Sequence, residues 1–199
     1  MKVIFNEVVK ELTAPTTEDI VVLINELLGE GFYFSHLISD GEAVYEQPET
    51  VLNLHIDTIQ ELQVIAVSAT DFVADLIHSA YDYLQRALPL LDVTTERFYA
   101  VAQAEQWADL NDLFGSIQWL YAMNETIASS IARPTHWDAV QVALQPIASI
   151  LEDFEQALVQ QDQVLIADLL AYEVKPAFEA TLQALTTIQD ESGGNDATH

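Results

Sequence analysis

The sequence predicts an α+β protein in which a small N-terminal β-grasp-like unit is followed by an all-α, up-and-down helical bundle. Residues 1–69 alternate short apolar runs with turn residues, whereas residues 70–190 keep a helical hydrophobic period throughout. Half of the 199 residues are hydrophobic, which is enough to form a core in each part. We therefore expect a small α/β domain over 1–69, a helical bundle over 70–190 and a disordered acidic tail over 191–199.

The first unit is expected to contain a hairpin, a helix, a second hairpin, a short helix and a closing strand. Apolar residues on both sides of Asn6–Glu7 indicate a hairpin turn, and Asp40–Gly41 indicates a second one. Thr16 or Thr17 is suited to cap the first helix, and Pro48 to open the second. The expected strands cover 3–5, 8–9, 32–38, 43–45 and 62–67. The first helix is expected to bury an apolar face between Ile20 and Leu28 and to stop at Gly29 and Gly31, and the second helix is expected over 48–55. This order resembles the β-grasp arrangement; if the first hairpin is a single strand, the order becomes βαββαβ, which is ferredoxin-like.

The second part is expected to consist of long amphipathic helices, each with one apolar stripe. Such helices are not stable alone, so they must pack against one another, and short loops favour an up-and-down bundle. Asp92, Thr94 or Thr95 is expected to start a separate short helix. The segment Thr135–Asp138 resembles a capping box at the start of an unbroken apolar seam. Three prolines inside helices are expected to bend or break them: Pro89, Pro146 and Pro176.

The chain is strongly acidic. It has 32 Asp and Glu residues against six Lys and Arg residues, a formal net charge of −26. Contacts to nucleic-acid phosphates need clustered basic residues, and an anionic membrane surface repels such a protein, so neither is expected as a partner. The excess of acids is consistent with a basic protein partner, with divalent cation binding, or with adaptation to a salty or alkaline setting.

Residue types and motifs that are missing exclude several kinds of chemistry. The absence of cysteine excludes disulfides, thiolate catalysis and cysteine-based zinc or iron–sulfur sites. The sequence has neither a glycine-rich phosphate loop nor a serine nucleophile motif, so no cofactor and no catalytic residue is predicted. No apolar run approaches the roughly 20 residues that span a bilayer, and Met1–Glu7 lacks the apolar core of a signal peptide. The cytoplasm is therefore the expected location.

One group of residues has the spacing of a metal site. Asp75, His78 and Asp82 follow an i, i+3, i+7 pattern, which places two carboxylates and an imidazole on one helix face. A di-metal site in a helical bundle also needs a carboxylate-x-x-His motif on a second helix, and no second motif of this kind is present. We therefore predict no metal site and keep these three residues as the only candidates.

Four further residues are notable in the helical part. Asn124 occupies a position in an apolar seam, where a buried amide usually fixes the register of the helices. Asp168 and Glu173 lie close to Pro176 and near an apolar stripe. A buried carboxylate there would have a raised pKa, or would bind backbone groups that the proline leaves free. Trp119 lies off the seam and is expected to be exposed.

Three short segments point to a group of known sequences. They are Ser39–Tyr45, Ile117–Leu120 and Asp168–Glu173. In these segments the chain resembles uncharacterised bacterial proteins that combine a small α/β head with an acidic helical bundle. The resemblance covers most of the chain, and it implies no known activity and no functional residue.

Two functional hypotheses follow from the sequence. The first is a non-enzymatic, intracellular interaction module, adaptor-like or chaperone-like, whose acidic bundle binds a basic or amphipathic partner. It follows from the charge, the long helices and the missing catalytic motifs. The second is a metal-binding bundle or metal-dependent enzyme that uses Asp75, His78 and Asp82 together with acids from neighbouring helices.

Overall fold

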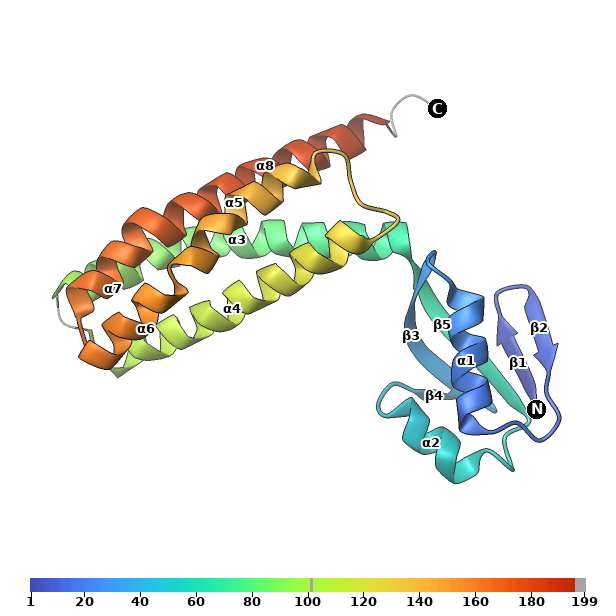
Figure 1. Cartoon of the computed structure of the whole chain (residues 1–199). Helices are drawn as coiled ribbons and strands as arrows, with labels where there is room; N and C mark the ends of the chain where they lie inside the picture. Colours follow the sequence, from blue (N-terminus) through green and yellow to red (C-terminus); the bar gives the residue numbers. More distant parts are fainter. Residues whose placement is uncertain (101, 196–199) are drawn as a thin grey trace. The chain divides into compact units, whose positions relative to one another are not determined.

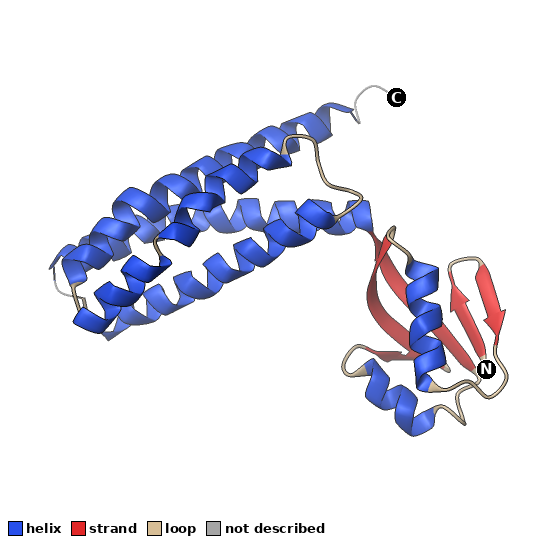
Figure 2. Ribbon diagram, in the orientation of Figure 1, coloured by secondary structure: helices blue, strands red, loops and turns tan. Residues whose placement is uncertain are grey.

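The computed structural model describes residues 1–100 and 102–195 and divides the chain into two compact units, Met1–Phe72 and Val73 onward (Figure 1). The sheet belongs to the first unit, and the second unit is built from helices (Figure 2). The sequence placed the boundary after residue 69. In the structure a long helix starts at Ala69, so that its first turn belongs to the first unit.

The first unit is a five-stranded mixed sheet with two helices. Its elements are β1 (Lys2–Phe5), β2 (Val8–Glu11), α1 (Thr17–Leu28), β3 (Phe32–Ser39), β4 (Glu42–Val44), α2 (Pro48–His55) and β5 (Glu61–Ser68). The strand order is β2-β1-β5-β3-β4; β1 and β5 are parallel, and the other neighbours are antiparallel. The β-grasp prediction is confirmed. The ferredoxin-like alternative is wrong, because β1 and β2 are two strands joined by a turn.

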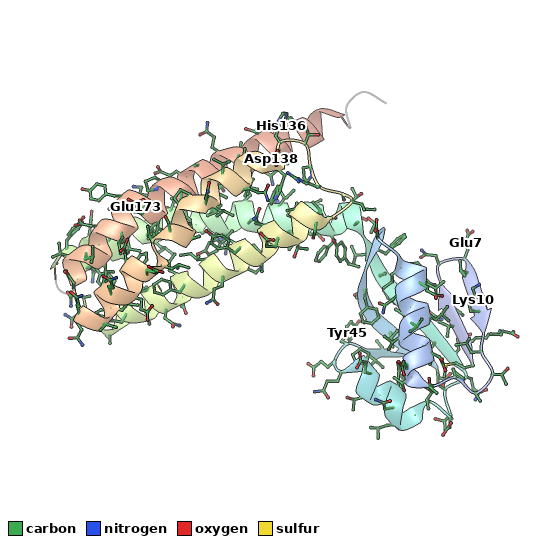
Figure 3. The ribbon with its side chains drawn as sticks, viewed as in Figure 1. Glu7, Lys10, Tyr45, His136, Asp138 and Glu173 are labelled. Atoms are coloured by element: carbon green, nitrogen blue, oxygen red, sulfur yellow. The ribbon has the colours of Figure 1, made fainter. Side chains whose placement is uncertain are left out.

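The hairpin turns of the first unit form where the sequence has residues that tolerate positive φ. Asn6 has φ 51° between β1 and β2, and Asp40 and Gly41 have φ 47° and 91° between β3 and β4. The side chains of Val3, Leu37, Leu62 and neighbouring apolar residues form the core of this unit. At the edge of the sheet, all four residues of β2 are exposed. Glu7 and Lys10 project from this hairpin (Figure 3).

The cap of α1 supports a first testable prediction. Thr16 and Asp19 form a capping box, in which each side chain accepts a hydrogen bond from the other residue's backbone N–H. Replacing Thr16 by alanine is expected to destabilise α1 by about 1 kcal/mol. The control is Thr17→Ala, one residue inside the helix. Hydrogen exchange of the α1 amides measures the effect, and equal acceleration in both variants would contradict it.

The same cap makes the stability of α1 depend on pH. The hydrogen bond that Asp19 accepts from the backbone of Thr16 lowers the pKa of Asp19 below its usual value of 3.8. A lowered pKa in the folded state means that the carboxylate stabilises the helix above that usual value and loses its effect as the pH falls through the lowered pKa.

The second unit is a bundle in which the chain makes four antiparallel passes (Figure 1). The passes are α3 (Ala69–Ala100), α4 (Ala104–Ser129), α5 with α6 (Trp137–Ser149 and Leu151–Gln160), and α7 (Gln163–Leu169) with a π-helical turn (Leu170–Val174) and α8 (Lys175–Asn195). One continuous apolar core joins all of them. Its largest fully buried side chains include Trp137, Phe98, Phe154 and Phe178. The prediction of an up-and-down bundle is confirmed.

One detail of the predicted helices is wrong. No separate helix starts at Thr94 or Thr95, because α3 is one helix of 32 residues and both threonines are buried in its interior. The apolar stripe continues from Leu91 to Phe98, and its burial outweighs the preference of these threonines for a cap. The helix that starts at Trp137 is interrupted at Ile150, four residues beyond Pro146, so the predicted break at this proline is confirmed. The apolar seam continues across the break, because Ile147, Ile150 and Phe154 are all buried.

The predicted capping box at Thr135–Asp138 is also wrong. His136 precedes α5 with a left-handed φ of 64° and makes no side-chain cap, and Asp138 instead forms an ion pair with Arg133. At the other end, α8 continues to Asn195, into the predicted tail. His136 lies 3.7 Å from Glu191 and holds this part of α8 against the start of α5 (Figure 3). Residues 196–199 of the predicted tail lie outside the described residues.

The prolines have different effects on the helices. Pro89 does not interrupt α3. Pro176 follows the π-helical turn Leu170–Val174, in which the wider winding accommodates the missing backbone N–H. Ahead of this turn, the Asp162 side chain caps α7 by accepting a hydrogen bond of 3.0 Å from the backbone N–H of Leu165.

Candidate functional site

An open pocket lies between α3 and α4 on the surface of the bundle. It has a volume of about 560 Å³, and we call it the aromatic pocket. Its lining residues are Ser79 and Tyr83 of α3 and Asn111, Asp112, Gly115, Ser116 and Trp119 of α4. The rings of Tyr83 and Trp119 lie edge to face, 6.3 Å apart at an angle of 69°. The prediction that Trp119 is exposed is confirmed, since 37% of its surface is accessible.

The part of α3 that lines this pocket belongs to a longer surface stripe. Helical spacing of three and four residues places seven side chains on one face of α3, and we call them the α3 stripe. They are Asp75, Ser79, Tyr83, Arg86, Leu90, Val93 and Arg97. Leu90 is 66% exposed and Val93 is 52% exposed, although both are aliphatic. The stripe therefore offers apolar surface to solvent next to the buried core of the bundle.

A matching stripe runs along α4. The same spacing places five side chains on one face, and we call them the α4 stripe. They are Glu105, Asp109, Asp112, Ser116 and Trp119. The first three form an acidic row, and α4 contains no Lys, Arg or His at all. The two stripes meet in the aromatic pocket, and we call the surface of α3 and α4 that the two stripes cover the groove.

Charged residues lie on both sides of the groove. Asp112 makes no side-chain hydrogen bond or ion pair with any other described residue, so its carboxylate is available to a ligand. Two basic residues lie on the α3 side, Arg86 and Arg97, and Arg86 donates from Nε to the backbone oxygen of Asp82 at 3.1 Å. The two stripes together contain four acids and two arginines, so the groove has a net negative charge.

Tyr83 anchors the inner wall of the aromatic pocket. Its ring also contacts Phe178 of α8, with centroids 6.4 Å apart. Burial raises the pKa of Tyr83 above its usual value of 10, and a hydrogen bond with Ser116 acts in the opposite direction. Tyr83 is therefore neutral at physiological pH and acts as a rigid aromatic surface with a polar edge.

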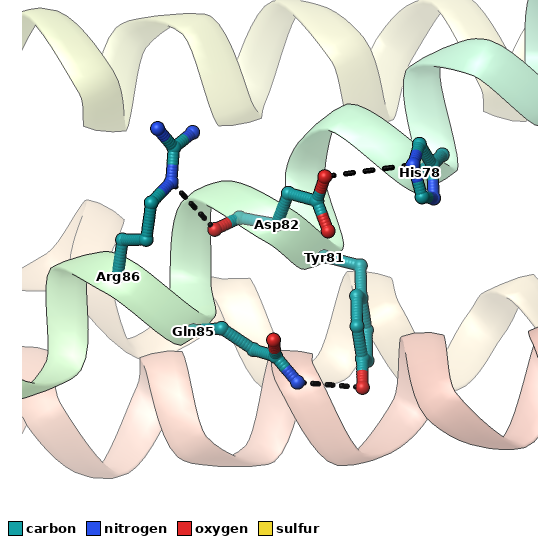
Figure 4. A network of polar contacts seen from close by, with 5 residues as sticks. All are labelled: His78, Tyr81, Asp82, Gln85 and Arg86. Carbon is teal, nitrogen blue, oxygen red and sulfur yellow. Dashed lines mark hydrogen bonds and ion pairs between the residues drawn. The ribbon is translucent and has the colours of Figure 1, made fainter.

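The three metal-site candidates lie on the surface of α3. Asp75, His78 and Asp82 are all exposed on α3. His78 Nε2 lies 3.5 Å from Asp82 Oδ2, an i, i+4 pair on the helix surface (Figure 4). Within residues 1–100 and 102–195, no three His, Asp or Glu side chains come together in a way that would hold an ion. Both side chains of this pair are exposed to solvent, and exposed pairs of this kind contribute little to stability.

Asn124 has a structural role. It is 6% exposed and accepts a hydrogen bond of 3.1 Å at Oδ1 from Nε1 of Trp137, which is fully buried. This bond joins α4 to the start of α5 inside the core. It satisfies two polar groups that would otherwise be costly to bury, and it fixes the alignment of the two helices, as the sequence predicted.

Asp168 and Glu173 differ in their surroundings. Asp168 is half-buried and accepts a hydrogen bond of 2.5 Å from the Tyr99 hydroxyl. This bond raises the pKa of Tyr99 to about 12. Nearby, Lys175 Nζ lies 2.6 Å from Asp92 Oδ1, and this hydrogen bond raises the pKa of Lys175. Both contacts join the end of α3 to the last pass.

Glu173 does not belong to this set of contacts. It is exposed on the π-helical turn (Figure 3), so the expectation of a buried carboxylate at this position is wrong. Leu170 and Val174 take the buried positions of the turn, and Tyr172 and Glu173 between them are exposed.

The fold and the groove define a class of protein: a β-grasp head joined to an acidic helical bundle with an open groove between two of its helices. The chain belongs to the family described as a domain of unknown function, DUF8042, which matches residues 75–184. This match covers more than half of the chain and includes both groove stripes. No curated protein and no solved structure matches the chain. Within the described residues, no helix combines the length and apolar character needed to cross a bilayer.

Sequence reasoning missed most of the groove. It identified Trp119, but not Tyr83, Gly115, Leu90 or Val93. The signal was present in the spacing, because residues 79, 83, 86, 90, 93 and 97 repeat at intervals of four and three beside the core stripe of α3. Distinguishing this second stripe from the core stripe requires knowing which face of α3 the other helices cover.

Proposed function

We propose that the protein is a non-enzymatic, cytoplasmic interaction module that binds a basic amphipathic helix of a partner protein in the groove between α3 and α4. The observation that carries this proposal is the combination of two exposed aliphatic side chains, Leu90 and Val93, with an acidic row on the facing helix. An amphipathic helix places apolar side chains at i, i+3, i+4 and i+7 into such grooves.

The dimensions of the groove suit a helical segment. The α3 stripe from Ser79 to Arg97 extends over about 27 Å, given a rise of 1.5 Å per residue. A partner helix of about 18 residues has the same length. Its apolar face would cover Leu90 and Val93, and lysines along one edge would meet the acidic row on α4.

The charge of the whole chain supports the same partner. A net charge of −26 attracts basic proteins from a distance and repels acidic ones. Ion pairs at the rim of an interface contribute more to the association rate and to specificity than to affinity. The exposed apolar residues therefore supply binding energy that salt does not screen, and the acidic row adds salt-dependent affinity and selects the partner and its orientation.

A peptide of about 18 residues tests this proposal, with leucines on one helical face and lysines on the flanks. Its binding to the full chain is measured by fluorescence anisotropy. The double variant Leu90→Ser/Val93→Ser is expected to bind it about tenfold more weakly, because two aliphatic contacts are lost.

The matched control changes two exposed valines outside the groove, Val142→Ser/Val159→Ser, which are 67% and 79% exposed on α5 and α6. This variant is expected to bind the peptide as the unchanged protein does. Equal affinities for the groove variant and the control variant would refute the proposed site.

A further inference from the structure

Gly115 is an unusual residue for the middle of a helix. A glycine in a helix interior costs about 1 kcal/mol relative to alanine. Two common structural reasons for glycine do not apply, because Gly115 lacks a positive φ and a Cβ placed on it would meet no atom within 4 Å. The missing side chain leaves the backbone of α4 open at the floor of the aromatic pocket.

The walls of the pocket have the chemistry of a cation site. Trp119 and Tyr83 present aromatic surfaces, and cations within about 6 Å of such faces are attracted by the ring quadrupole. Asp112 supplies a carboxylate that makes no side-chain contact with other described residues. No basic residue lines the pocket, so among the residues that do, Asp112 alone sets its charge.

We propose that this pocket takes the side chain of one arginine of the bound helix, an inference that rests on the proposed function. The guanidinium stacks on Trp119 and donates hydrogen bonds to the Asp112 carboxylate, while the aliphatic part of the side chain lies over Gly115. Arginine fits better than lysine, because its flat group stacks on a ring and donates two parallel hydrogen bonds to a carboxylate. An acidic side chain would be repelled by Asp112.

The test compares two peptides of about 18 residues that share the leucine and lysine pattern described above. One has a central arginine, and the other has citrulline, which has nearly the same shape and no charge. The arginine peptide is expected to bind the full chain about tenfold more tightly, by analogy with charge-assisted hydrogen bonds and cation–π contacts.

A protein variant tests the pocket itself. Gly115→Leu fills the floor without changing any charge and is expected to remove the difference between the two peptides. Because the site has room and α4 gains a better helix former, the melting temperature is expected to stay the same or to rise. Gly115→Ala, with a much smaller side chain, is the control and is expected to retain most of the difference.

The outcomes separate this inference from the groove proposal. If both peptides bind the unchanged protein equally well, the arginine pocket is refuted and the groove proposal stands. If neither peptide binds, both proposals are refuted. If Gly115→Leu still prefers the arginine peptide tenfold, the cation is recognised elsewhere and the pocket assignment is wrong.

Discussion

Replacing Trp137 by alanine is expected to lower the free energy of unfolding of the bundle by about 3–5 kcal/mol. Trp137 is fully buried, and its indole N–H donates to the side chain of Asn124. The variant therefore leaves a large cavity and also deprives a buried amide of its partner, which adds to the loss. Chemical denaturation followed by far-ultraviolet circular dichroism measures the change, because the bundle contains most of the helix.

Trp119→Ala is the matched control for this prediction. It makes the same chemical change at a position that is 37% exposed, and it is expected to cost only about 1–2 kcal/mol. Similar losses at both positions would show that Trp137 is not the central residue of the core. The comparison also establishes whether Trp119 variants remain folded for binding experiments.

Neutralising the acidic row is expected to weaken binding of the lysine-rich peptide by about 10–100-fold at low ionic strength. The triple variant is Glu105→Gln/Asp109→Asn/Asp112→Asn, which removes three charges along one face of α4. The affinity should then depend less on salt, because fewer ion pairs are screened. Titrations at two salt concentrations measure both effects.

The control for the acidic row removes three exposed charges from α6. It is Glu152→Gln/Asp153→Asn/Glu155→Gln, which changes the net charge by the same amount outside the groove. At the higher of the two salt concentrations, about 0.1 M, we expect this variant to bind within about threefold of the unchanged protein, since exposed charges are then screened over about 10 Å. Equal losses in both triple variants would mean that the overall charge, rather than the groove, attracts the peptide.

Local sequence signals predicted the head well because its turns depend on individual residues. Asn6, Asp40 and Gly41 have the positive φ values that hairpin turns require, and Thr16 caps α1. The hydrophobic period likewise predicted the bundle and the buried position of Asn124. These features are encoded within a few residues of chain, so they can be read without knowledge of tertiary contacts.

Features that depend on contacts between distant segments could not be read in this way. Thr94 and Thr95 have the residue type of a cap, but burial against the other passes keeps α3 continuous through them. The groove depends on which faces of α3 and α4 are left uncovered, and the hydrophobic period alone does not specify this.

The exposed edge of β2 has a consequence for the behaviour of the protein in concentrated solution. Its outer backbone groups have no strand partner within the sheet, so a second copy of the chain could in principle extend the sheet sideways. The strand is only four residues long and ends in the charged residues Lys10 and Glu11. Two copies would also repel each other, because each chain has a net charge of −26. Self-assembly through this edge should therefore be suppressed at low ionic strength and become easier as salt screens the repulsion.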